Sequence, residues 1–169
     1  MGEPGPSTRC IHVGRDDGPL GRVIEPIERS VIGRFDTAER FARVMAGEEE
    51  GLLYGRIWSP TVAATAAAIA SLEGLEAGLL TASGMAAIHA ALVGLIPSGG
   101  RAVFVQPLYG NTLSLARDLL RDRMGIDVVV TDRDPASVAA ACAGGCDVLY
   151  AETIANPGVA VADLPALAA

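Results

Sequence analysis

The segment Ser83-Gly84-Met85 has the residue types of an anion site. It follows the apolar segment 77–82 and opens a run with helical periodicity. Backbone N–H groups, a hydroxyl and the positive end of a helix dipole would therefore meet there, and a phosphate fits such a site. On its own, the segment also suits an ordinary helix start, with Ser83 as N-cap and Gly84 for close packing.

Two further segments carry side chains that can contact a ring. Tyr109 lies in QPLYGNT, where a tyrosine can cover a flat aromatic ligand, although many such tyrosines only pack in a core. Glu152 and Asn156 lie in ETIANPG. Asn-Pro is first a turn signal and second a source of hydrogen bonds to a ligand.

Tyr54 and Arg56 are two residues apart in YGRIWSPT. In an extended segment they share one side, and a guanidinium matches phosphate oxygens in a fork. The alternative for Arg56 is an ordinary solvated arginine.

The elements that position these residues follow an α/β pattern. Ser59 and Pro60 predict a helix that closes before Gly74, with Val62, Ala66 and Ile69 on one face. Met85, Ile88, Leu92 and Leu95 predict a second helix that stops at Pro97. Strands are expected at 101–105, 126–130 and 147–152, and helices at 112–123, from 134 to near 144, and from 163.

Alternation of strands and helices predicts a mostly parallel sheet with flanking helices, built from right-handed βαβ units. Ligands of such sheets collect where strands end and helices begin, and the residues after the expected strands lie at that rim. Residues 1–50 differ, with turn signals, no sustained periodicity and seven of the thirteen arginines. We expect an extended arm with short ordered pieces over 1–50 and the regular part over 51–169.

Composition excludes several classes of function. The net charge of −7 argues against nucleic acid as a partner. The most apolar stretch, 79–96, is interrupted by Ser83, Gly84 and His89, so no membrane span is expected. The N-terminus lacks the pattern of a signal peptide, which predicts a cytoplasmic protein. Cys10, Cys142 and Cys146 form neither a disulfide pattern nor a metal-site pattern, so no metal is expected.

All thirteen basic residues are arginines, so the sequence contains no lysine. Neither a GxxxxGK[ST] phosphate loop nor a Schiff base between this chain and an aldehyde cofactor is then possible through a side chain.

The order of these segments resembles one family. TRCIHVG, YGRIWSPT, LEGLEAGLLTASGMAAI, LYGNT and ETIANPGVAVAD, which together span 8–163, are similar to the cysteine and methionine metabolism class of pyridoxal-phosphate enzymes. This class includes cystathionine γ-synthase, cystathionine lyases, methionine γ-lyase and O-acetylhomoserine sulfhydrylase. The resemblance implies the N-terminal part of a fold-type I large domain, with pyridoxal 5'-phosphate as cofactor.

The resemblance also implies roles for the residues. Ser83, Gly84 and Met85 match the loop that holds the cofactor phosphate, and Tyr109 matches the tyrosine stacked on the pyridine ring. Asn156 matches a residue near the 3-hydroxyl of the ring. Tyr54 and Arg56 match the pair that reaches the phosphate in a neighbouring subunit, which implies a homo-oligomer, a dimer of dimers in the full-length family.

The chain departs from the family at three positions and in length. Ser59 stands where Asn is usual, Ile154 where Pro is common, and Asn111 where well-known methionine γ-lyases carry Cys. The family continues well beyond this length, with the aspartate of the pyridinium nitrogen, the lysine that holds the cofactor, and a small C-terminal domain.

We therefore expect the N-terminal portion of a transsulfuration enzyme that catalyses γ-replacement or γ- or β-elimination on cystathionine, methionine or an O-acylhomoserine. The 169 residues alone would be inactive, and none of them is expected to be catalytic. One alternative is a truncated, non-catalytic remnant that binds a paralogue. The other is an unrelated α/β anion-binding module.

Overall fold

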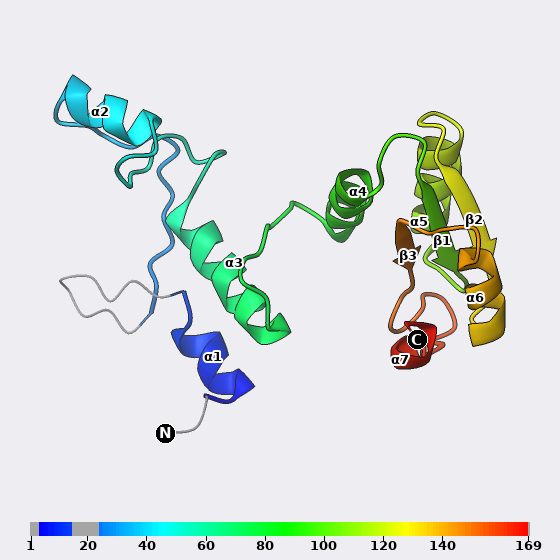
Figure 1. The fold of residues 1–169 in the computed structure, drawn as a ribbon. Coiled ribbons are helices and arrows are strands. Elements are labelled where there is room, and N and C mark those ends of the chain that lie inside the picture. The colour runs from blue at the N-terminus through cyan, green and yellow to red at the C-terminus, as the bar shows by residue number, and fades with distance from the viewer. Residues whose placement is uncertain (1–3, 15–23, 169) are drawn as a thin grey trace. The chain divides into compact units, whose positions relative to one another are not determined.

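A computed structural model of the protein describes residues 4–14 and 24–168. The chain forms two compact units, residues 1–80 and 81–169, which are described separately (Figure 1). Within the described ranges, no helix combines the length and the apolar character needed to cross a membrane.

The first unit contains α1 (Pro6–His12), α2 (Ala38–Met45) and α3 (Pro60–Glu73). α1 packs against α3, and Arg9 donates a hydrogen bond to the carbonyl oxygen of Ser71 at 2.6 Å. Glu49 forms ion pairs with Arg40 at 2.7 Å and Arg43 at 2.9 Å, so the chain after α2 folds back onto that helix. The expected short ordered pieces within 1–50 are thus α1 and α2, while the turn signals at 17–21 lie outside the described residues.

The helix predicted from Ser59 is α3, which ends at Gly74 in the left-handed conformation (φ 69°). Its predicted face is wrong in part: Ala66 and Ala70 are buried, whereas Val62 and Ile69 are exposed. α3 is alanine-rich and apolar over most of its surface, so the spacing of its larger side chains does not indicate which side packs.

The second unit is built on a parallel sheet, as the sequence predicted, and the strand order is β2-β1-β3. β1 (Arg101–Val105) lies between β2 (Asp127–Thr131) and β3 (Val148–Tyr150), and Val103 pairs with Val129 and Leu149. The helices of this unit are α4 (Gly84–Leu95), α5 (Gly110–Ser114), α6 (Pro135–Cys142) and α7 (Leu164–Leu167).

The helix predicted over 112–123 is divided in the structure. α5 continues directly into a π-helical segment, η1 (Leu115–Arg121). The wider turn is visible at its end, where the N–H groups of Asp122 and Met124 donate to the carbonyl oxygens of Arg117 and Leu119, both at 3.0 Å. Apolar spacing alone does not distinguish one wide turn from an α-helix.

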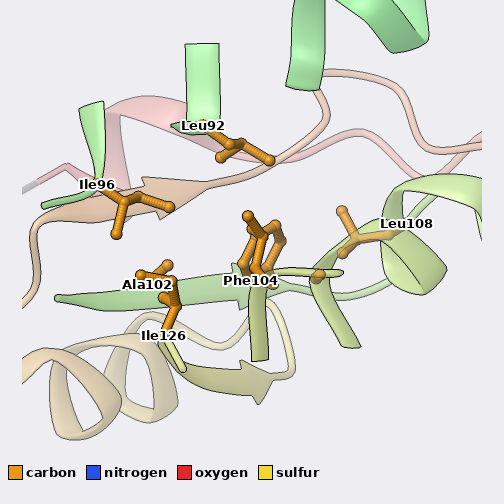
Figure 2. Packing of buried hydrophobic residues seen from close by; sticks show 8 residues of the cluster. Leu92, Ile96, Ala102, Phe104, Leu108 and Ile126 are labelled. Carbon is orange, nitrogen blue, oxygen red and sulfur yellow. The ribbon is translucent and has the colours of Figure 1, made fainter. Parts of the chain in front are cut away.

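Both faces of the sheet are covered. One core cluster joins Phe104 of β1 to side chains from α4, η1 and the loops (Figure 2). The other places Val105 against Val138 of α6 and Leu167 of α7. In α4, Leu92 is buried as predicted, but Leu95 is 67% exposed and Ile96 is buried in its place. The α-helix ends at Leu95, so Ile96 follows the extended chain toward the sheet.

Candidate functional site

The loops that follow β1 and β3 meet at the carboxyl rim of the sheet through Glu152. The backbone N–H of Tyr109 donates to both carboxylate oxygens of Glu152, at 3.0 Å to Oε1 and 3.2 Å to Oε2. The N–H of Asn156 donates to Oε2 at 3.4 Å. Tyr109 and Asn156, which are far apart in sequence, are therefore anchored to the same carboxylate.

The start of α4 presents backbone donors. Ser83 is its N-cap, and the Ser83 hydroxyl accepts the N–H of Ala86 at 3.1 Å. Among the residues that the structure describes, none accepts the N–H groups of Gly84 and Met85, as is usual at the first turn of a helix. A Cβ built on Gly84 would meet no atom within 4 Å, so the approach to these donors is open.

Met85 is connected to the sheet through Thr112. The Thr112 hydroxyl lies 3.9 Å from the sulfur of Met85, and Thr112 is fully buried. Thr112 also contacts Tyr150, whose ring packs on Phe104 with centroids 5.5 Å apart. Sequence reasoning did not single out Thr112; its signal is a polar residue on the buried side of α5.

Burial raises the pKa of Tyr150, the hydrogen bond with Thr112 opposes that rise, and the charge of Glu152 adds to it. The neutral phenol is thus favoured in the folded protein. Because the folded pKa is raised, the associated stability is present below the unfolded value and is lost as pH rises beyond about 10.

Replacing Thr112 with Val is expected to raise the pKa of Tyr150 further, because the hydrogen bond that favours the phenolate is removed. An absorbance titration measures this, with Tyr150→Phe identifying the signal of Tyr150. Thr65→Val is a matched control, since the Thr65 hydroxyl only donates to the carbonyl of Thr61 in α3. A Tyr150 midpoint unchanged by Thr112→Val would contradict this account.

The ring of Tyr109 is available to a ligand. Tyr109 is 39% exposed, and its hydroxyl accepts a hydrogen bond from the Asn111 amide at 3.0 Å. That contact holds the hydroxyl and leaves the ring face to other partners. Asn156 is also exposed, so its amide can reach a bound molecule.

Tyr54 and Arg56 lie together in the first unit, as predicted, but not in an extended segment. The chain turns there, with the N–H of Ile57 donating to the carbonyl of Tyr54 at 2.8 Å. The guanidinium carbon of Arg56 lies 5.3 Å from the centroid of the Tyr54 ring. A cation–π contact therefore takes the place of the alternation expected for a strand.

The second unit thus brings together Met85, Tyr109 and Asn156 through Thr112, Tyr150 and Glu152, with Ser83 and Gly84 adjoining Met85. Tyr54 and Arg56 belong to the other compact unit. The donor set at α4 suits a phosphate, and the exposed tyrosine ring suits a flat heterocycle.

Comparison with known proteins agrees with this chemistry. The chain belongs to the Cys/Met metabolism family of PLP-dependent enzymes, whose sequence model matches residues 7–169. Pyridoxal 5'-phosphate is the cofactor of this family.

Curated relatives include an L-methionine gamma-lyase of Porphyromonas gingivalis, 35% identical over 95% of this chain and 40% of that protein. An O-acetyl-L-homoserine sulfhydrylase of Corynebacterium glutamicum is 38% identical over 95% of this chain and 37% of that protein. The chain therefore spans about 40% of the length of the relatives it matches.

Solved structures agree on the fold, which is the N-terminal part of a fold-type I large domain. Corynebacterium glutamicum metB matches with a TM-score of 0.83 and 27% identity, over 98% of this chain and 41% of that one. Campylobacter jejuni metY, solved with N'-pyridoxyl-lysine-5'-monophosphate, matches with a TM-score of 0.82 and 26% identity, over 96% of this chain and 40% of that one.

Proposed function

We propose that the chain is the N-terminal portion of a PLP-dependent enzyme of sulfur amino-acid metabolism, which catalyses γ-replacement or γ- or β-elimination. The substrate would be cystathionine, methionine or an O-acylhomoserine. The observation that carries the proposal is the open start of α4, whose Met85 is connected through Thr112 to the rim that bears Tyr109 and Asn156. The names of the relatives support the substrate class.

In this proposal the chain binds and orients the cofactor. The N–H groups of Gly84 and Met85 and the hydroxyl of Ser83 bind its phosphate, because the start of a helix favours an anion. The Tyr109 ring covers the pyridine ring, and Asn156 reaches a polar group on it. When bound, pyridoxal phosphate supplies an electron sink for the amino acid substrate.

The first unit would act in an assembly. We propose that Tyr54 and Arg56 reach the cofactor phosphate of a second copy, because a guanidinium suits a phosphate and both side chains are available at a turn. Residues 1–50 would then be an arm and 51–169 part of the cofactor-binding domain. We place the assembly in the cytoplasm as a homo-oligomer with a small amino acid as substrate.

The alternative is a non-catalytic remnant that binds a paralogue. It is consistent with the absence of lysine from these 169 residues, because they cannot by themselves hold the cofactor covalently through a side chain. The nucleotide sequence after the codon of Ala169 separates the two: an in-frame continuation with an SxTK-type stretch supports the enzyme, and a genuine stop codon supports the remnant.

Replacing Gly84 with Val is expected to weaken binding of pyridoxal phosphate and of inorganic phosphate at least tenfold, by roughly 1.4 kcal/mol, because the side chain fills the open approach to the N–H donors. Equilibrium dialysis measures both ligands. Gly94→Val is the matched control, since Gly94 lies on the same helix and also faces open space. Equal phosphate affinity in the two variants would move the anion site elsewhere.

A further inference from the structure

We propose that Glu152 is a positioning residue that holds the Tyr109 loop and the Asn156 loop at a fixed separation. The role of this separation in ligand binding rests on the function proposed above. The contact itself depends only on the hydrogen bonds that Glu152 accepts from the two loops.

The Glu152 carboxylate joins segments that are distant in sequence. Glu152 is 43 residues from Tyr109, and its two oxygens accept the same N–H at 3.0 and 3.2 Å. Its Oε2 also accepts the N–H of Asn156 at 3.4 Å. Because β3 pairs with β1, the position of Glu152 just after β3 is set by the sheet, and the carboxylate passes that position to both loops.

This task requires an ionised carboxylate of glutamate length. An ionised carboxylate accepts with both oxygens, and its hydrogen bonds are stronger than those between neutral groups. Glutamine has one acceptor oxygen, and its NH₂ group would turn toward a backbone N–H. Aspartate keeps the charge but is shorter by one carbon–carbon bond, about 1.5 Å.

We expect the loss of Glu152 to affect contacts to the ring of a ligand and not contacts to its phosphate. Tyr109 is the N-cap of α5, so a shift of its backbone moves its ring. Asn156 would shift against it. The start of α4 takes no part in the contact, so the loss of Glu152 should disturb contacts to a pyridine ring and leave a phosphate at Gly84 and Met85 unaffected.

Hydrogen exchange of the 169-residue chain, followed by NMR without ligand, tests the contact directly. In Glu152→Gln the amides of Tyr109 and Asn156 are expected to exchange about tenfold faster, since hydrogen bonds to a charged acceptor are lost. Asp132→Asn is the matched control: Asp132 follows β2 and accepts only the N–H of Asp134 in its own loop, at 3.0 Å. Unchanged exchange at Tyr109 in Glu152→Gln overturns the proposal.

The amides of Val103 and Phe104 in β1 report whether the substitution loosens the whole unit. If these amides also exchange faster, the Glu152 contact is tested in the wild-type protein instead. A scalar coupling across the hydrogen bond, from the Tyr109 amide nitrogen to the Glu152 carboxylate carbon, supports the contact, and its absence overturns it.

Two probes separate this inference from the proposed function. Glu152→Gln is expected to weaken pyridoxal phosphate binding about tenfold and to leave inorganic phosphate binding unchanged, with Asp132→Asn unchanged for both. Wild-type affinity for pyridoxal phosphate in a variant with accelerated exchange overturns the positioning role. If the wild-type chain binds neither probe, the proposed function fails for this chain, while the exchange experiment still decides whether Glu152 holds the loops.

Discussion

Incubated with pyridoxal phosphate and L-methionine or O-acetylhomoserine, the 169-residue chain is expected to give no turnover. The sequence contains no lysine, so no side-chain amine can hold the cofactor or move protons at the substrate. Proton transfer by a positioned group alone contributes about 10²–10⁴-fold to a rate, and covalent attachment is lost as well. Release of 2-oxo acid measures elimination, and release of acetate from O-acetylhomoserine in the presence of sulfide measures γ-replacement.

Borohydride reduction followed by peptide mass spectrometry provides the control. The amine of Met1 is the one primary amine that this sequence supplies, so it should carry any reduced cofactor. Acetylation of that amine should remove the adduct. A reduced cofactor on a side chain, or turnover that survives acetylation, would show that the absence of lysine does not disable the chain.

The architecture of the second unit could be predicted from the sequence because its signals are local. AVFV and DVVV are continuous apolar runs, and they form β1 and β2. Ser83, Asp134 and Asp163 each cap a helix through a side-chain oxygen, which is a local interaction within a few residues. Parallel pairing follows from the length of the connections.

The errors arise where tertiary packing decides. The spacing predicts Leu95 on the buried face of the helix, but α4 ends there, and Ile96 is buried instead. The π-helical segment leaves no mark in the apolar spacing, because Ala116 and Leu120 are four residues apart and satisfy an α-helix equally well. Tyr54 and Arg56 meet across a turn, which their spacing did not indicate.

The candidate site shows the same division. Helix capping could place the N–H donors of Gly84 and Met85, and the strand ends could place Tyr109 and Asn156 on one rim. The connections between them could not be predicted. Thr112 reaches Met85 and Tyr150, and Glu152 reaches the Tyr109 loop, through contacts between residues distant in sequence.

Phe104→Ala is expected to produce the largest loss of stability in the second unit, about 3–5 kcal/mol, because a fully buried ring is replaced by a cavity. Phe104 is 0% exposed, lies at the centre of the main cluster, and packs on Tyr150. The free energy of unfolding is measured by denaturation followed by circular dichroism. Phe41→Ala is the matched control, since Phe41 is 43% exposed on α2 and should lose far less.

The two units can be followed by different signals in this experiment. Trp58 lies in the first unit, so its fluorescence follows that unit, while the amide signals of β1 follow the second. Phe104→Ala should shift the β1 transition. Equal losses for the two variants would show that Phe104 is not the centre of the packing. Because Phe104 supports Tyr150, and Tyr150 contacts Thr112, the same variant should also increase exchange at the rim.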